Sequence, residues 1–297
     1  MTGSEWTSLD AAMVPPPIPI DAHKGLLGHV LCVCGSPEMP GAAQLVVRAA
    51  QRAGAGLVTL AVMQTELFDR VAPYTPETIF LDCSRTKDLY VGRLPREIAN
   101  YACDVRVAGP GLNASGRTRE LVRRLVEDEF VGPLVLDADA LNVLAGVPEL
   151  LTLSQSQVVL TPHPGEAERL IEREIPKDEA GRIECALEIA GRSGALCVLK
   201  GHGTVVTDGK RVYVNPSGGP AMATAGAGDV LAGVLGAYLA WSLRCGDPEY
   251  DGFQAACAAV FAHGVAGDLA AKELGVRGTI ASDLVQFLPR AQRQIEG

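Results

Sequence analysis

Short apolar runs that alternate with longer segments of helical spacing constrain the fold of this 297-residue chain more than any other feature. The short runs are rich in Val, Ile and Leu, as buried strands are, and the longer segments place apolar residues three and four positions apart, as helices do. Strands separated by helices pair in parallel, because each crossover returns the chain to the same edge of the sheet. We expect strands at 29–34, 57–62, 79–83, 105–108, 134–137, 158–161 and 196–200, and helices among them at 42–53, 117–129, 140–144, 165–171 and 178–192.

The pattern changes after position 200. Residues 204–207 and 211–215 flank Asp208-Gly209-Lys210, and Asp-Gly supplies the positive-φ residues of a tight hairpin turn. Helical spacing returns at 229–240, 253–274 and 282–294. We therefore expect one α/β domain at 23–297, with a mostly parallel central sheet, helices on both faces and an antiparallel hairpin at its edge. Residues 1–22, which include three consecutive prolines, are expected to form an N-terminal arm.

Charge and cysteine content exclude several classes of partner. The formal net charge of -9 argues against a surface that binds nucleic acid, because such surfaces are basic. The eight cysteines show neither a Cys-x-x-Cys pair nor zinc-site spacing, so we expect free thiols in a reducing compartment. The N-terminus lacks the basic start of a signal or transit peptide, and the apolar stretch 255–271 is too short to span a bilayer. We expect a cytoplasmic protein that contacts neither nucleic acid nor membrane.

Glycine and short polar residues cluster directly after the expected strands. In open α/β sheets, ligands bind beyond the carboxyl ends of the strands. A single glycine at such a place is usually a turn residue, but five junctions of this kind at one edge of one sheet indicate a cleft. The junctions are Gly35-Ser36 with Gly41-Ala42, Gly109-Pro110-Gly111, Asp137-Ala138-Asp139-Ala140-Leu141-Asn142, Pro162-His163-Pro164-Gly165-Glu166 and Lys200-Gly201-His202-Gly203-Thr204.

The strongest single motif is Ala225-Gly226-Ala227-Gly228-Asp229, which opens an expected helix. A glycine-rich turn at a helix N-terminus directs several backbone N–H groups, and the positive end of the helix dipole, at one point where an anion can bind. Asp229 could instead be an ordinary N-cap. An acid at the mouth of so apolar a helix needs a partner, however, and phosphate chemistry supplies one. The motif therefore predicts a phosphate-handling turn.

In this order the segments resemble the ribokinase-like superfamily, whose hallmark is a Gly-x-Gly-Asp turn that opens a helix. The Pro-His-Pro-Gly-Glu and Asp-Ala-Asp-Ala-Leu-Asn segments narrow the resemblance to the NAD(P)H-hydrate dehydratases, and the likeness runs from about residue 23 to the last helix. The resemblance implies a carbon–oxygen lyase of metabolite repair. Such an enzyme dehydrates the S epimer of hydrated NADH or NADPH, uses ADP or ATP with Mg²⁺, and with ADP releases AMP and phosphate. It also implies a homotetramer and an epimerase activity supplied by a separate chain.

The resemblance also implies roles for individual residues. Asp229 is implied to take the proton of the substrate hydroxyl as that hydroxyl attacks the terminal phosphate. Glu166 is implied to act on Mg²⁺ through water. Substrate contacts are implied for Ala42, Gly111, Asn142, His163 and Asp229, and contacts with ADP or AMP for Lys200, Gly201, His202, Gly203, Thr204, Gly226 and Gly228.

Several polar residues have a second, structural interpretation. His163 could be a rigid loop residue between two prolines, and Lys200 a solvated lysine at a strand end. Asp139 is expected to cap the helix that follows it. His263 and Asp268, inside an apolar helix, are expected to be hydrogen-bonded polar groups rather than ligands.

The chain departs from the family pattern at a few positions. Asn113 stands where the family often has glycine, and Ala225 and Ala227 replace a frequent glycine and threonine, although both alanines keep their backbone N–H donors. A small-molecule kinase of the same superfamily, acting on a hydroxymethylpyrimidine or a sugar, is an alternative function. A nucleotide sensor without turnover is another, although the intact Gly228-Asp229 pair argues against it.

Overall fold

The structure, a computed structural model, describes residues 13–297 without the side chains of residues 90 and 91. Within this range nine strands form one sheet in the order β3-β2-β1-β4-β5-β6-β7-β8-β9. All neighbours from β3 to β7 pair in parallel, whereas β8 runs antiparallel to β7 and β9. The strands are β1 (His29–Val33), β2 (Leu57–Val62), β3 (Ile79–Asp82), β4 (Val105–Ala108), β5 (Leu134–Leu136), β6 (Val158–Leu160), β7 (Leu196–Leu199), β8 (Val205–Thr207) and β9 (Val212–Val214).

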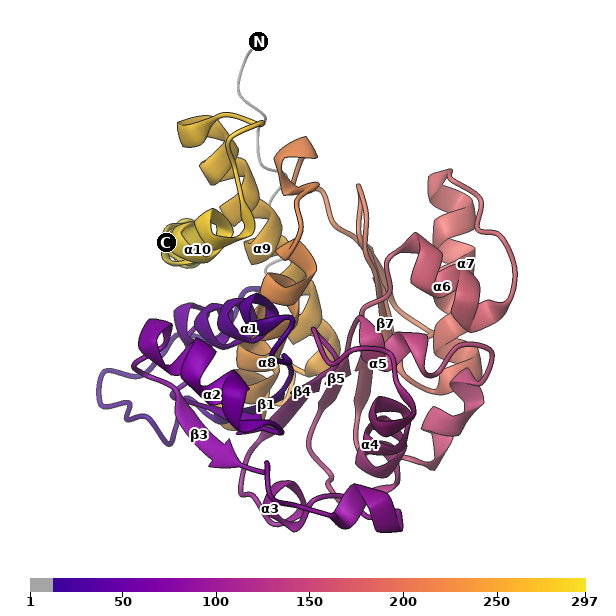
Figure 1. The fold of residues 1–297 in the computed structure, drawn as a ribbon. Coiled ribbons are helices and arrows are strands. Elements are labelled where there is room, and N and C mark those ends of the chain that lie inside the picture. The colour runs from indigo at the N-terminus through magenta and orange to yellow at the C-terminus, as the bar shows by residue number, and fades with distance from the viewer. Residues whose placement is uncertain (1–12) are drawn as a thin grey trace.

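Helices cover both faces of this sheet (Figure 1). Strand residues alternate between two cores: Val30 and Cys32 pack toward α1, α8, α9 and α10, whereas Leu31 and Val33 pack toward α4, α6 and α7. The helices are α1 (Pro40–Arg52), α2 (Thr65–Val71), α3 (Arg96–Ala99), α4 (Gly116–Glu127), α5 (Asp139–Asn142), α6 (Pro164–Ile171), α7 (Glu179–Ser193), α8 (Ala227–Arg244), α9 (Gly252–Leu274) and α10 (Ala281–Glu296).

The predicted sheet, its parallel pairing and its edge hairpin are confirmed. Every predicted strand and helix is present, and the largest error is at α8, which continues to Arg244 instead of ending at 240. The prediction missed α2, α3 and four 3₁₀ turns, because one or two helical turns are too short to show a period in the sequence. The eight cysteines are free thiols, as predicted, and Cys32 and Cys34 are fully buried.

Helix α9 is the centre of the C-terminal layer. It is the one described helix that is long and apolar enough to cross a membrane, but 83% of its most apolar stretch is buried inside the fold. It packs between α8 and α10, and α10 also contacts α1. These contacts account for its composition as a core helix.

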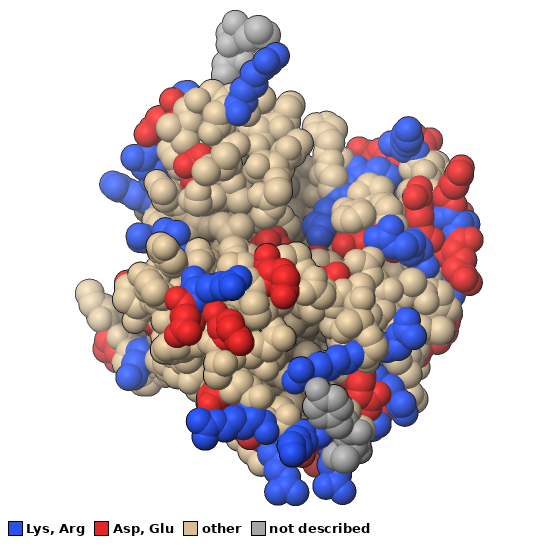
Figure 2. Space-filling model, in the orientation of Figure 1, with Lys and Arg blue, Asp and Glu red and all other residues tan. Residues whose placement is uncertain are grey.

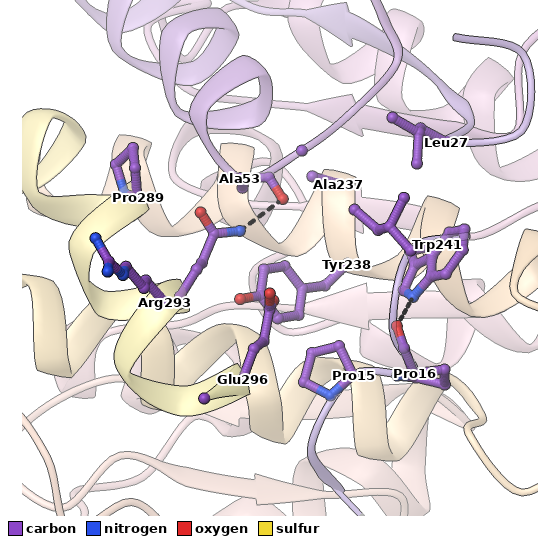
Figure 3. Close-up of a pocket in the computed structure, with 14 residues that line it drawn as sticks. Pro15, Pro16, Leu27, Ala53, Ala237, Tyr238, Trp241, Pro289, Arg293 and Glu296 are labelled. Atoms are coloured by element: carbon purple, nitrogen blue, oxygen red, sulfur yellow. Dashed lines mark hydrogen bonds between the residues drawn. The ribbon is translucent and has the colours of Figure 1, made fainter. Parts of the chain in front are cut away.

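The described part of the N-terminal arm is fastened to α8. The Trp241 indole N–H donates to the Pro16 carbonyl oxygen over 3.0 Å, and Met13 and Val14 pack against the core. Figure 3 shows the cavity that the arm helps to close, about 390 Å³ in volume, between the C-terminal half of α8, the end of α10 and Pro15. Residues 1–12 of the predicted arm lie outside the described range.

Candidate active site

The N-termini of α1 and α8 meet at the carboxyl edge of the sheet. The strand order reverses around β1, so the loops after β1 and β4 diverge and leave a crevice there. Gly226, at the N-cap of α8, has φ +89°, and a Cβ on it would lie 2.5 Å from Leu45 Cδ1 on α1. No side-chain cap satisfies the first turn of α8 or of α1. Two sets of helix N–H groups are thus available to an anion at this corner.

Figure 2 shows the molecular surface hollowed between the part formed by α9 and α10 and the part formed by α6 and α7. Acidic and basic side chains lie together at the bottom of this hollow, in a surface that is otherwise mostly uncharged there. The cavity beside Trp241 lies elsewhere, near the other end of α8, and none of the residues that line it belongs to the predicted site.

Asp229 lies in the first turn of α8, where burial and neighbouring carboxylates act on it. Burial, together with the charges of Asp137 and Asp139, raises the pKa of Asp229 to about 6, while the Lys200 ammonium acts in the opposite direction. Such a carboxylate is ionised at neutral pH but holds a proton far more readily than an exposed aspartate. This is the property required of a general base near pH 7.

Lys200 joins three strand ends below the α8 turn. Its Nζ donates to Asp137 Oδ1 over 2.6 Å and lies 3.8 Å from Glu166 Oε2. Both carboxylates are almost completely buried. Burial alone would lower the pKa of Lys200, but the charges of Asp137 and Glu166 outweigh it and raise that pKa. A Cβ on Gly228 would lie 3.3 Å from Nζ, so the ammonium lies directly against the glycine-rich turn. A solvated strand-end lysine is therefore the wrong interpretation.

His163 and Glu166 form a capping box at the start of α6. Glu166 N–H donates to His163 Nδ1 over 3.2 Å, and His163 N–H donates to Glu166 Oε2 over 2.8 Å. The His163 side chain stays half exposed, so the cap also places it at the crevice edge. Asn142 accepts a 2.8 Å hydrogen bond from Arg169 of α6. Capping and substrate contact are compatible roles for His163, and its substrate contact stays a prediction.

Gly111 and Ala42 lie against each other, and their substrate contacts stay predictions. Gly111 has φ +66°, and a Cβ on it would lie 2.8 Å from Ala42 Cβ. Asn113 also adopts a positive φ, 64°, which asparagine tolerates better than most residues, so it replaces glycine at little cost.

Asp139 does not cap α5, and that prediction was wrong. The N-cap is Ala138, with φ +51°, and it makes no side-chain cap hydrogen bond. The Asp139 carboxylate instead accepts the Asn113 N–H over 2.8 Å. It therefore connects the loop after β4 with the start of α5.

Arg182 is a site residue that sequence reasoning missed. From the first turn of α7 its guanidinium donates to the His202 carbonyl oxygen and, over 3.3 Å, to that of Leu199. Gly201 has φ +143°, which favours glycine, and a Cβ on it would lie 3.0 Å from Arg182 Nη2. Burial lowers the pKa of Arg182. The guanidinium thus supports the whole turn 200–204 from behind, and the paired glycines at 201 and 203 were the only trace of it in the sequence.

Comparison with known proteins identifies the family. The sequence profile of the NAD(P)H-hydrate dehydratase family matches residues 30–290, which is most of the chain.

The chain belongs to the NAD(P)H-hydrate dehydratase family.

Two relatives and one solved structure illustrate the similarity. A bifunctional NAD(P)H-hydrate repair enzyme of Moorella thermoacetica is 41% identical in an alignment of 286 positions that covers 92% of this chain and 51% of that protein. An ADP-dependent (S)-NAD(P)H-hydrate dehydratase of Neisseria meningitidis serogroup B is 35% identical in an alignment of 268 positions that covers 89% of this chain and 84% of that protein. The ADP/ATP-dependent NAD(P)H-hydrate dehydratase of Bacillus subtilis, co-crystallised with ATP and Mg²⁺, superposes with a TM-score of 0.80 at 28% identity and covers 96% of each chain.

These comparisons confirm the NAD(P)H-hydrate dehydratase resemblance and the ribokinase-like fold. The chain spans about half the length of the first bifunctional relatives that it matches. The individual roles assigned to the dehydratase site residues are not tested by the comparisons and stay predictions.

Proposed function

We propose that this protein dehydrates the S epimer of hydrated NADH or NADPH and so regenerates NAD(P)H. The proposed co-substrate is a nucleotide, ADP, which is converted to AMP and phosphate. The observation that carries the proposal is Asp229, a carboxylate with a pKa raised to about 6, in the uncapped first turn of α8 beside Lys200. A base and an anion-binding turn lie side by side, as phosphoryl transfer to a hydroxyl group requires. Family membership selects the hydrated dinucleotide as the hydroxyl substrate.

The proposed reaction has two steps. Asp229 takes the hydroxyl proton while the hydroxyl oxygen forms a bond to the terminal phosphorus, and the bond from that phosphorus to AMP breaks. The ring nitrogen then donates its electron pair, the carbon–oxygen bond breaks, and phosphate leaves. Loss of a proton from the adjacent ring carbon restores the dihydropyridine. Phosphorylation is needed because hydroxide is a poor leaving group and phosphate a good one.

The two ligands occupy opposite sides of Asp229 in this proposal. The turn 200–204, supported by Arg182, binds ADP together with Gly226 and Gly228. The hydrated ring lies on the side of α1, where Ala42 and Gly111 pack together, and His163 and Asn142 lie at the α6 side of the crevice. Helix N–H groups and the Lys200 ammonium stabilise the charge that develops on the transferring phosphoryl group.

The carboxylates of the site fit a magnesium ion carried by the nucleotide. Among residues 13–297 no group of three His, Cys, Asp or Glu side chains could by itself hold a metal. Asp137 and Asp139 nevertheless add their negative charge to that of Asp229, and the Lys200 ammonium opposes them. Glu166 contributes a further carboxylate, 3.8 Å from Lys200 Nζ. Mg²⁺ prefers oxygen ligands and keeps several waters when it binds with phosphates, so Glu166 would hold it through water. Bound there, Mg²⁺ would neutralise phosphate charge.

A nucleotide-dependent absorbance assay tests the proposed function. Purified protein receives hydrated NADH with ADP and Mg²⁺, or with ATP and Mg²⁺, and the near-ultraviolet absorbance of restored NADH is followed together with release of phosphate. Recovery of NADH with equal release of phosphate is expected. A stable phosphorylated product with no recovery would identify a kinase of the same superfamily, and nucleotide binding without either product would identify a sensor.

We also propose a cytoplasmic location and a homotetramer. The eight unpaired cysteines support the location, because thiols persist in reducing compartments. Size-exclusion chromatography with light scattering tests the assembly.

A further inference from the structure

Two polar residues lie inside the apolar helix α9. Asp268 accepts the Gly218 N–H over 2.6 Å, as expected of a hydrogen-bonded core group. His263 is buried and its Nε2 has no hydrogen-bond partner among the described residues, so the expectation is wrong for this atom. Ordered water pairs with many such atoms, so an unpartnered nitrogen alone does not identify a ligand. Neither residue therefore indicates a further function.

Asp137 and Glu166 are the two acidic residues that are buried among residues 13–297, and the proposed reaction gives Asp137 no role. Asp137 comes directly after β5, and its side chain is 1% exposed. Taking a carboxylate out of water costs free energy unless a cation pairs with it. The depth of this carboxylate therefore calls for an explanation.

The cation that pairs with Asp137 is Lys200, which follows β7, two strands away in the sheet. Lys200 Nζ donates to Asp137 Oδ1 over 2.6 Å and lies farther, 3.8 Å, from Glu166 Oε2. The ammonium of a lysine is carried on a flexible four-carbon stem, so its carboxylate partner decides where it lies. Here Asp137, the closer of the two carboxylates, holds it.

The ion pair lies against the phosphate-handling turn. A Cβ on Gly228 would be 3.3 Å from Lys200 Nζ and 3.8 Å from Asp137 Oδ2, so a larger residue at this position would press on the ammonium. Gly228 belongs to the first turn of α8, whose N–H groups have no side-chain cap. Asp137 thus keeps the ammonium beside the N–H groups that are expected to receive the phosphates.

The backbone next to Asp137 is strained. Ala138 has φ +51° and ψ −116°, which lies outside even the left-handed helical region that residues with a Cβ can enter. Such conformations cost free energy and persist only where the surrounding structure enforces them, and they concentrate at functional sites. The strain at Ala138 therefore indicates that the direction of the neighbouring side chains matters.

Neighbouring segments enforce this conformation. A Cβ on Gly109, in the loop after β4, would lie 1.8 Å from the Asp137 carbonyl oxygen, so that loop packs directly on the peptide group between Asp137 and Ala138. The Asp137 carboxylate points to Lys200 beyond β7, and the Asp139 carboxylate accepts an N–H of the loop after β4. The turn at Ala138 thus directs two nearby carboxylates to opposite sides of β5.

We propose that Asp137 is a positioning residue for phosphoryl transfer, an inference that rests on the proposed function. Asp137 holds the Lys200 ammonium beside the first turn of α8, and the strained backbone at Ala138 fixes the direction of its carboxylate. The ammonium is thereby kept at the phosphoryl group in transfer and away from Glu166. It needs no rearrangement when charge develops on that group.

Two substitutions of Asp137 separate positioning from other roles. Asp137→Ala removes both carboxylate oxygens and releases Lys200 toward Glu166. We expect it to lose about 10- to 100-fold in kcat and to change the KM for ADP by less than about threefold, because an aligned charge acts mainly in the transition state. Asp137→Asn keeps an oxygen that accepts from the ammonium, so it should recover most of the loss. The Mg²⁺ concentration for half-maximal rate should stay within about twofold of the wild-type value in both variants.

A double-mutant cycle with Lys200→Met tests whether Asp137 acts through Lys200. When Lys200 is already replaced, Asp137→Ala should cost less than about a further threefold in kcat. The full loss in that background would overturn the proposal, as would equal losses in the Ala and Asn variants or a raised requirement for Mg²⁺. Each of these results would show that Asp137 acts on the substrate or the metal directly. Wild-type kcat in a folded Asp137→Ala protein would also overturn it.

Ala138→Gly tests the strained backbone without a change of charge, and it keeps the proposal testable if Asp137→Ala fails to fold. Glycine enters positive φ freely, so the variant should melt no lower than the wild type. The carboxylate would be held less firmly, and kcat should fall about three- to tenfold. Glu172→Gly is the matched control: Glu172, exposed at the end of α6, also has a positive φ, +56°, and its substitution should leave kcat unchanged. Unchanged kcat in Ala138→Gly would overturn the role of the strained turn.

Crystal structures of the wild type and of Asp137→Ala test the geometry without turnover. Lys200 Nζ should lie beside Gly228 in the wild type and within hydrogen-bond distance of Glu166 in the variant. An ammonium that stays in place without Asp137 would overturn the proposal. A wild type that restores no NADH would instead refute the proposed function, so the two failures are distinguishable.

Discussion

Replacement of Asp229 by asparagine should separate catalysis from stability in a single variant. Asn keeps the shape of the side chain but cannot accept the hydroxyl proton, so we expect turnover of hydrated NADH to fall about 10²- to 10⁴-fold, the usual contribution of a general base. ADP should bind at least as tightly as to the wild type. The variant lacks a carboxylate that would face the phosphates across the α8 turn.

The same change should stabilise the protein at neutral pH. Burial and the neighbouring carboxylates raise the pKa of Asp229 from 3.8 to about 6, so the folded state holds its proton more tightly than the unfolded chain does. Ionised Asp229 therefore destabilises the fold above pH 6, by at most about 3 kcal/mol. Because the carboxylate is only partly buried, about 1–2 kcal/mol is a realistic gain for Asp229→Asn, or about 2–4 °C in melting temperature.

The stability gained by Asp229→Asn should decrease as the pH falls. As pH falls through 6 toward 3.8, Asp229 takes up a proton first in the folded state and the penalty disappears, so at pH 5 the difference between variant and wild type should be about half its value at pH 7.5. Urea unfolding at both pH values measures this difference in the free energy of unfolding. Asp69→Asn, at an exposed position on α2, is the control and should show neither effect. Unchanged turnover in Asp229→Asn, or a variant less stable than the wild type at pH 7.5, would refute the reasoning.

Three further predictions concern the same corner. The kcat/KM of the wild type should fall about tenfold per pH unit on the acid side of a midpoint near 6, because the base must be ionised; a flat profile down to pH 5 would contradict this role. Arg182→Lys keeps the charge but not the planar fork on the His202 and Leu199 carbonyl groups, so the KM for ADP should rise about tenfold with little change in kcat. Gly226→Ala places a Cβ at positive φ and against Leu45, and urea denaturation should show a loss of about 2 kcal/mol, whereas Gly41→Ala, where a Cβ meets nothing, should show none.

Periodicity predicted the sheet well because most of its strands are buried on both faces. Such strands are continuous apolar runs, and the glycine-rich junctions that follow them mark the same edge. The sequence also indicated Asp229 and Lys200 as candidate site residues, because Asp229 lies at the start of a predicted helix and Lys200 at the end of a predicted strand. The short helix α2 showed no helical periodicity in the sequence, because its seven residues give fewer than two full turns.

Contacts between distant residues could not be predicted. The bond from Lys200 to Asp137 joins residues 63 positions apart, and neither residue type specifies the other. Arg182 acts on backbone carbonyl groups, which carry no sequence pattern at all. Asp139 had the residue type and position of a cap, but the positive φ of Ala138 turns it toward the loop after β4. Backbone geometry decided these three cases.

The layer formed by α8, α9 and α10 has a consequence for biosynthesis. Val30 and Val107 of the first-made strands are covered by α8, where a Cβ on Gly236 would lie 3.0 Å from Val30 Cγ1 and 2.8 Å from Val107 Cγ2. More than 200 residues separate Val30 from its cover, and a ribosome adds only about 5–20 residues per second. One apolar face of the nascent sheet, covered at first by α1 alone, thus remains for many seconds without α8, α9 and α10. A chain interrupted before residue 227 would present that face to chaperones, proteases and other nascent chains.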